Sequence, residues 1–125
     1  MTLMKKHTTI DDMVKKIKAM PGADSVGMIL CHNGIVRGTS RDGRKVTGVA
    51  VSADRKKLQD ILTAQKSRPG IFEILVHVNE GELKIGDDLL LIAMAGDIRE
   101  NVIPVLIDTL NSIKKSVTSK TEQFV

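Results

Sequence analysis

The stretch Gly81-Glu82-Leu83-Lys84-Ile85-Gly86-Asp87-Asp88 and the apolar run from Leu89 to Ala95 behind it decide the fold class. The two outer glycines bracket a short connecting segment. The run after it is long enough and apolar enough to predict a β-strand buried on both faces. On the other side, Ile71 to Val78 is rich in β-branched and aromatic residues and predicts a second strand.

Further strands are expected on the N-terminal side of this stretch. Ser25 to His32 is an apolar run that predicts another buried strand, and extended structure resumes at Ile35 to Arg37. Asp42-Gly43 is a strong hairpin signal, after which Lys45 to Val51 returns as a strand. These signals favour a mainly antiparallel sheet.

Helical patterns flank and interrupt the strands. Thr8 or Thr9 can cap a first helix, and Ser52-Ala53-Asp54 opens a second one. A third helix carries apolar residues at helical spacing from Val102 to Ile113. Pro104 leaves two interpretations open: either Asn101 is the N-cap and the proline lies in the first turn, or the helix is kinked there. The whole predicts a single α+β domain over residues 1–125, with three helices packed on the sheet and mobile tails at residues 1–7 and 116–125.

Composition narrows the classes of function. The net charge is +4 and favours anionic partners. Aromatic residues make up only 2% of the chain, which disfavours nucleic-acid binding through base stacking. The single cysteine, Cys31, excludes an internal disulfide and suits the cytoplasm. No apolar run is long enough to span a membrane, and the N-terminus does not resemble a secretion signal.

Several kinds of active site have no support. The three histidines, His7, His32 and His77, lie far apart in sequence and lack metal-ligand spacing. Cys31 and His32 are neighbours on a strand and so point to opposite faces, which prevents a direct catalytic pair. A buried, apolar environment is therefore expected for Cys31.

Four basic residues are candidates for an anion site. Arg37 follows a buried strand and a glycine turn, at the rim of the sheet, and Arg99 stands near a helix start. For both, a solvated surface arginine is the plainer interpretation. Lys114 ends the last helix, where a cation already suits the helix dipole, and Lys120 lies in a polar segment.

From about Asp24 to Glu122, the order and spacing of these residues resemble those of the large, catalytic subunit family of molybdopterin synthase. Gly34-Ile35-Val36-Arg37 is similar to the family's G-x-V-R, and residues 81–88 are similar to its G-x-L-x-x-G-[DE]-[DE]. Arg99 then falls on the arginine of a His-Arg pair and Lys114 on the lysine that ends the next helix. Lys120-Thr121-Glu122 matches the family's W-K-x-E segment after a one-residue deletion.

The resemblance implies an α/β-hammerhead-like fold and an enzyme of molybdenum cofactor biosynthesis. Such a subunit transfers sulfur from a thiocarboxylated, ubiquitin-like carrier (MoaD-like) to cyclic pyranopterin monophosphate, and the product is molybdopterin. It implies a homodimer with one carrier docked on each subunit and no permanently bound cofactor or metal. Lys114 and Lys120 would be catalytic, and Arg37 and Arg99 would hold the substrate.

The chain also departs from the family's pattern. Val78-Asn79 stands in place of one His-Arg pair, Ile98 in place of the histidine of the other, and Ser119 precedes Lys120 where the family has tryptophan. A non-catalytic module of the same fold, binding a carrier or a pterin or nucleotide phosphate, is therefore an alternative. A basic nucleic-acid-binding α+β domain is a further, weaker alternative.

Overall fold

The computed structural model describes residues 2–3 and 8–125. The elements in chain order are β1 Thr2–Leu3, α1 Ile10–Lys18, a 3-10 turn Ala23–Ser25, β2 Met28–Ile35, β3 Val46–Ala53, α2 Arg55–Lys66, β4 Ile71–Val78, β5 Gly81–Lys84, β6 Asp88–Gly96, α3 Arg99–Ser116 and β7 Thr118–Phe124. Within the described residues, none of the helices has the length and apolar character needed to cross a membrane.

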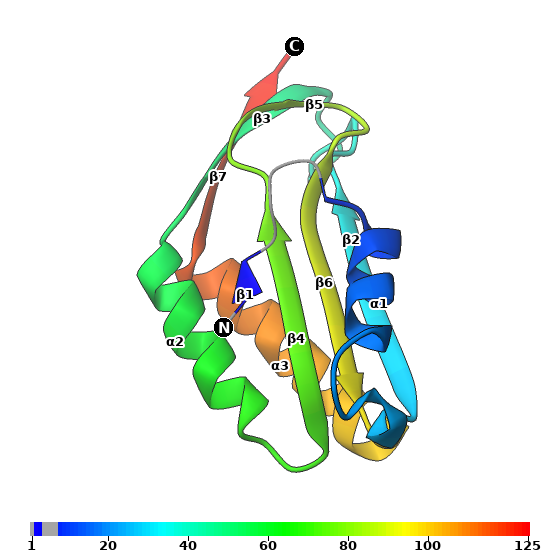
Figure 1. Ribbon diagram of the computed structural model, residues 1–125. Helices are drawn as coiled ribbons and strands as arrows, with labels where there is room; N and C mark the ends of the chain where they lie inside the picture. The colour runs from blue at the N-terminus through cyan, green and yellow to red at the C-terminus, as the bar shows by residue number, and fades with distance from the viewer. Residues whose placement is uncertain (1, 4–7) are drawn as a thin grey trace.

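The strands form two sheets. A four-stranded sheet has the order β1-β4-β6-β2, and a three-stranded sheet has the order β5-β3-β7. Among the described strands, β1 and β4 run parallel and the other pairs are antiparallel. The smaller sheet lies at the end of the larger one where β4 ends and β6 begins (Figure 1). The α+β class with a mainly antiparallel sheet and three helices is confirmed.

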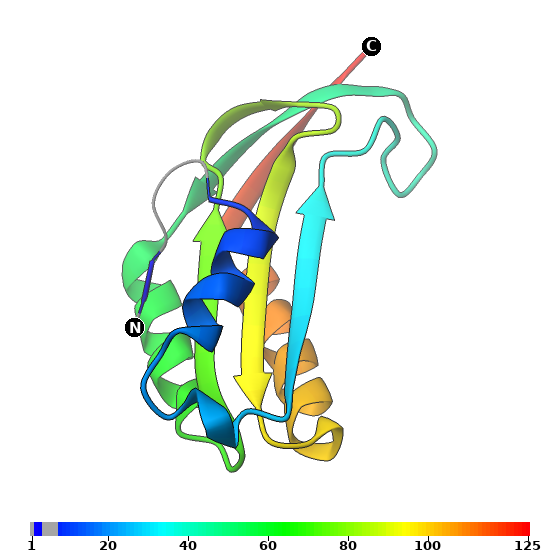
Figure 2. The same ribbon diagram turned by 45° about the vertical axis from the view of Figure 1, so that its right-hand side comes forward.

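Helices cover both faces of the four-stranded sheet, α1 on one face and α2 and α3 on the other (Figure 2). Strand β6 supplies both cores because its side chains alternate. Leu91, Ala93 and Ala95 pack towards α1, and Leu90, Ile92 and Met94 pack towards α2 and α3. All six are buried, as the apolar run predicts. Burial of each large apolar side chain contributes about 1.5–3 kcal/mol.

Helix α1 begins at a capping box, as predicted for Thr9. The Thr9 hydroxyl oxygen accepts the Asp12 backbone N–H at 3.1 Å, and the Asp12 carboxylate accepts the Thr9 N–H at 3.3 Å. We expect Thr9→Ala to lower the free energy of unfolding by about 1 kcal/mol, measured by urea denaturation. Thr63→Ala is the matched control, because this exposed threonine lies inside α2 and its loss is expected to be neutral. Equal effects of the two changes would contradict the capping role.

The hairpin predicted at Asp42-Gly43 is wrong, because the two strands that flank this turn, β2 and β3, do not pair with each other. The turn itself forms: Gly43 has a φ of 86°, and Thr39 and Lys45 make an isolated antiparallel bridge. However, β2 pairs with β6, whereas β3 pairs with β5 and β7. Turn residues determine local geometry, whereas β2 lies beside β6, where its half-buried Met28 and Leu30 pack against the core.

The C-terminal prediction is also wrong. Residues 116–125 were expected to be a mobile tail, yet Thr118–Phe124 forms β7 and pairs with β3. The segment lacks apolar alternation because β7 is an edge strand whose residues are all exposed or only half-buried. At the N-terminal tail expected over residues 1–7, Thr2–Leu3 pairs with β4 as β1, and residues 1 and 4–7 lie outside the described residues.

Helix α3 begins earlier than the proline pattern suggested. Its N-cap is Ile98, so Asn101 lies inside the first turn and Pro104 is the sixth helical residue. The Asp97 carboxylate accepts hydrogen bonds from the Ile98 N–H at 2.6 Å and from the Asn101 side-chain amide at 2.9 Å. The hydrogen bonds from Asn101 and Ile98 lower the pKa of Asp97, and the helix begins three residues before the start expected from an N-cap at Asn101. Placement of Pro104 in the first turn is therefore wrong.

Candidate functional site

Two adjoining cavities open beside the C-terminal end of α3. The larger, of about 520 Å³, is lined by Ile35, Val36, Arg37, Arg41, Val49, Leu89, Lys114, Lys120 and Glu122. The smaller, of about 290 Å³, is lined by His32, Gly34, Ile35, Arg41, Val51, Leu89, Leu90, Lys114, Thr118 and Lys120. The structure thus brings three of the four predicted site residues together, namely Arg37, Lys114 and Lys120.

The register of β7 explains why two charged residues face these cavities. Lys120 pairs with Val51 and Glu122 pairs with Val49, and both valines are buried. Paired residues on neighbouring strands point to the same side. Lys120 and Glu122 therefore share the inner face of the small sheet, whereas Ser119 and Thr121 point outwards.

The C-terminal end of α3 supplies Lys114. The preceding Ile113 is fully buried in the core, and Val117, one residue after the helix, is buried as well. The carbonyl of Val117 accepts the Asp54 N–H at 2.9 Å, which joins this end of α3 to the start of α2. Lys114 is exposed on this rigid support and lines both cavities.

The site is strongly cationic. Arg37, Arg41, Lys114 and Lys120 are set against one carboxylate, Glu122. Among the described residues, no ion pair within 4.0 Å involves any of these four cations. Nor do three His, Cys, Asp or Glu side chains of that part of the chain gather as a metal site would require. Unpaired cations around a cavity favour an anionic ligand held by side chains.

His32 is a residue of the site that the sequence did not reveal. It lies on β2 opposite Ile92, facing α3, and lines the smaller cavity. Burial, and then the charge of Lys114, lower the pKa of His32, so its neutral form is favoured at neutral pH. Arg41 and Glu122 were likewise missed, because a loop arginine carries no pattern and β7 was interpreted as a tail.

Arg99 does not join this group. It is the first residue of α3, its side chain is 77% exposed, and it is paired with Glu100 at 3.5 Å. It lines a shallow hollow with Gly27, Met28, Asp97, Ile98 and Glu100. Lys114 stands fifteen positions after Arg99 on the same helix, about 22 Å along the axis. Within one chain, Arg99 therefore cannot contact a small ligand bound at Lys114.

Cys31 is exposed rather than buried, which corrects the expectation from its apolar run. It lies on the edge strand β2, where α1 covers Ile29 but does not extend over Cys31. Partial burial still raises the pKa of the Cys31 thiol, which leaves it a poor nucleophile at neutral pH. The structure gives no catalytic use for it.

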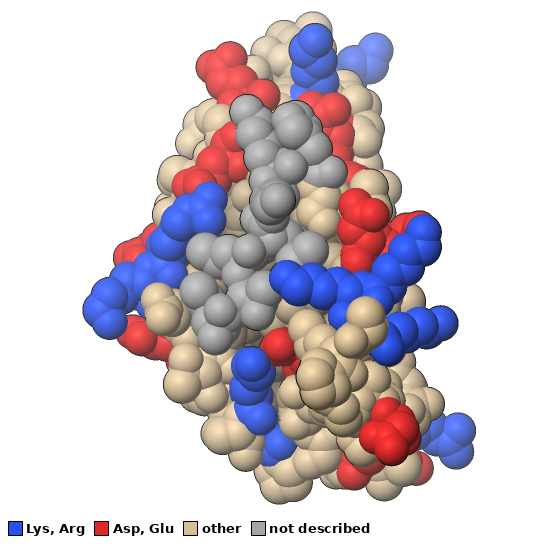
Figure 3. Space-filling view, viewed as in Figure 1, with Lys and Arg blue, Asp and Glu red and all other residues tan. Residues whose placement is uncertain are grey.

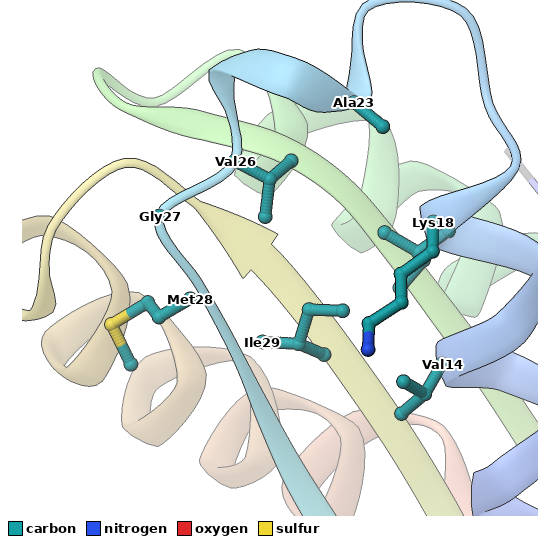
Figure 4. Close-up of a pocket in the computed structure, with 8 residues that line it drawn as sticks. Val14, Lys18, Ala23, Val26, Gly27, Met28 and Ile29 are labelled. Carbon is teal, nitrogen blue, oxygen red and sulfur yellow. The ribbon is translucent and has the colours of Figure 1, made fainter.

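A separate hollow of about 520 Å³ lies between α1 and β2 (Figure 4). It is lined by Val14, Ile17, Lys18, Ala23, Val26, Gly27, Met28 and Ile29. Lys18 is its one ionisable residue, and Met28 points away from it (Figure 4). Because Lys18 is the one ionisable residue of this lining, the hollow has fewer groups that could bind or react with a ligand than the site beside α3.

Fold and site together define a class: an α+β protein with a cationic cavity between the end of a helix and an edge strand. The sequence profile of the MoaE protein family matches residues 3–116. The chain therefore belongs to the MoaE family, as the resemblance implied. A search of curated proteins by sequence returned no match.

Solved structures share this fold. Molybdopterin synthase from Staphylococcus aureus aligns with a TM-score of 0.79 at 20% identity, over 98% of this chain and 90% of that one. Molybdopterin cofactor biosynthesis protein E from Burkholderia multivorans aligns at 0.77 and 20% identity, over 99% and 88%. A complex of subunits 1 and 2 of molybdopterin-converting factor from Helicobacter pylori contains a chain that aligns at 0.73 and 16% identity, over 98% and 83%.

Proposed function

We propose that this chain is the large subunit of a molybdopterin synthase, which transfers sulfur from a thiocarboxylated carrier to cyclic pyranopterin monophosphate. The observation that carries the proposal is the convergence of Arg37, Lys114 and Lys120 on one cavity in a chain of the MoaE family. Both reactants are anions, and the cations of this cavity suit them.

The geometry suggests a division of labour. Arg37 lines the larger cavity, and Arg41 lines both cavities. Each guanidinium can hold a phosphate through planar, bidentate hydrogen bonds. Lys114 and Lys120 line both cavities and can stabilise a thiocarboxylate anion and donate a proton where charge develops. In each transfer the sulfur of the carrier forms a bond to a pterin carbon while a carbon–oxygen bond of that carbon breaks. Water then hydrolyses the acyl–sulfur bond, so the sulfur stays on the pterin and the carrier ends with an ordinary carboxylate.

A ubiquitin-like carrier is the proposed protein partner. The Helicobacter pylori structure is a complex of two subunits of molybdopterin-converting factor, and one of them shares this fold. We also propose a cytoplasmic location, which the single free cysteine supports. The described residues provide no metal cluster, and we propose no resident cofactor: the pterin is substrate and molybdopterin is product.

The alternative of a non-catalytic carrier-binding module has one specific observation in its favour. Asn79 stands where the resemblance leads us to expect an arginine, and its side chain is used structurally. It accepts a hydrogen bond from His77 at 2.8 Å and donates one to the Asp88 carbonyl at 2.6 Å. Nucleic-acid binding has no comparable support, because Lys and Arg are interspersed with Asp and Glu on the face seen in Figure 3.

Reconstitution tests the proposal. The purified chain is mixed with its organism's thiocarboxylated carrier and cyclic pyranopterin monophosphate, and the dithiolene product is measured through its oxidised fluorescent derivative. Product formation is expected. Carrier binding without product would favour the non-catalytic module, and absence of both would overturn the proposal.

We also propose the homodimer that the resemblance implies, because it gives Arg99 a role that this residue cannot have within one chain. We expect Lys114→Ala and Arg99→Ala each to abolish most activity and an equal mixture, after exchange of subunits, to recover about a quarter of it. Half of the randomly mixed dimers are mixed pairs, and each has one intact site. The measurement is product formation before and after exchange. No recovery would contradict a contribution of Arg99 across the interface, and full activity of Arg99→Ala alone would remove it from the site.

A further inference from the structure

The smaller cavity combines cations with a neutral base and has no acid. Arg41 comes from the loop between β2 and β3, Lys114 from α3 and Lys120 from β7, and His32 faces them from β2. The residues from the other packed elements carry no charge: Val51 of β3 and Leu89 and Leu90 of β6. The carboxylate of Glu122 lines the adjoining, larger cavity instead.

The Nε2 atom of His32 has no hydrogen-bond partner. It is the one buried side-chain nitrogen or oxygen atom of the described, non-exposed residues that lacks a partner. Buried polar atoms are nearly always paired, because an unpaired one loses its water without compensation. The His32 ring lies against Gly34, where a Cβ would stand 3.0 Å from Nε2. Because Gly34 has no side chain, it supplies no side-chain partner to Nε2.

A charged imidazole needs a negative neighbour here. With Lys114 nearby and no carboxylate in the lining, protonation of His32 adds a further positive charge to a cationic cavity. A bound anion reverses this balance, because it attracts the imidazolium and accepts its hydrogen bond.

We propose that His32 takes up a proton when an anion binds in the smaller cavity and that the resulting imidazolium becomes part of the anion site. One proton passes from solvent to an imidazole nitrogen, and no other bond changes. The inference rests on the anion-binding part of the proposed function. It adds a residue that senses pH and does not depend on sulfur transfer.

The sign of the effect follows from linkage. In the free protein, burial and Lys114 lower the pKa of His32, so its ring is neutral at neutral pH. An anion raises that pKa, and a complex that binds more protons than its free components forms more readily as the pH falls. We therefore expect sulfate, which does not titrate in this range, to bind about fivefold more tightly at pH 5.5 than at pH 7.5.

The experiment is isothermal titration of the full chain with sulfate, at constant ionic strength and in two buffers of different ionisation heat, so that the protons taken up are counted. NMR follows the imidazole Cε1–H of His32 in the same wild-type protein. His32→Phe keeps the ring volume, and His32→Gln is a second variant; both are expected to lose the proton uptake. His77→Gln is the matched control, since His77 is buried beside Asn79 and absent from the cavity lining.

Proton uptake in wild type and in His77→Gln, lost in the His32 variants, supports the proposal. Binding independent of pH, uptake that persists without His32, an unmoved His32 resonance, or absence of sulfate binding would each overturn it. Dithiolene formation is measured separately. An inactive chain that still shows His32-dependent proton uptake would refute the proposed function and leave this inference standing.

Discussion

Replacing Lys114 by alanine is expected to lower the rate of dithiolene formation by at least about 100-fold. Lys114 lines both cavities, so one ammonium faces the anion in either compartment. In the proposed mechanism, its loss removes a charge that stabilises the thiocarboxylate and a proton donor at the reacting atoms. The measurement is single-turnover formation of product with saturating carrier, which separates the chemical step from carrier binding.

The neighbouring lysine provides the control. Lys115 is also exposed at the end of α3 but lines neither cavity, so Lys115→Ala removes the same charge from the same helix turn. We expect its activity to stay within about twofold of wild type and its urea midpoint to match that of Lys114→Ala. Equal losses of activity in the two variants would show that general positive charge, and not a placed ammonium, supports the reaction.

Local signals predicted the elements well. Thr9, one of two candidates, caps α1, α2 begins behind the expected Ser52-Ala53-Asp54 with Asp54 as its cap, and β4 spans the predicted Ile71–Val78. A cap or a short apolar strand depends on residues within one or two turns, which are adjacent in sequence. Partner choice depends on burial over the whole chain. The turn at Asp42-Gly43 therefore formed without joining the two strands that flank it.

The site shows the same division. Lys114 was assigned through the register of the family resemblance, and the fold places it beside Arg37 and Lys120. His32 had a signal, because an ionisable residue ends an apolar strand, but its spacing was weighed only against metal and thiol chemistry. The place of His32 in the site depends on the fold, which brings the end of α3 and the inner face of β7 beside β2 around one cavity.

Strand β7 links the stability of the small sheet to the chemistry of the cavity. Its pairing with β3 helps to cover Val49 and Val51, and the same register turns Lys120 and Glu122 inwards. The segment was the least promising part of the sequence, and the MoaE family match ends at residue 116, just before it. The resemblance pointed to Lys120 in this segment, but only the strand pairing shows that Lys120 and Glu122 line the cavity.

A chain that ends at Val117 is therefore expected to lose about 3 kcal/mol of unfolding free energy and nearly all synthase activity. The cost comes from exposing two valines that are 3% and 5% exposed in the intact chain and from leaving the edge of β3 unpaired. Urea denaturation followed by circular dichroism measures the stability. The control ends at Phe124 and removes only Val125, which is 88% exposed. If the chain ending at Val117 kept the stability and activity of that control, β7 would be dispensable and Lys120 would have no part in the reaction.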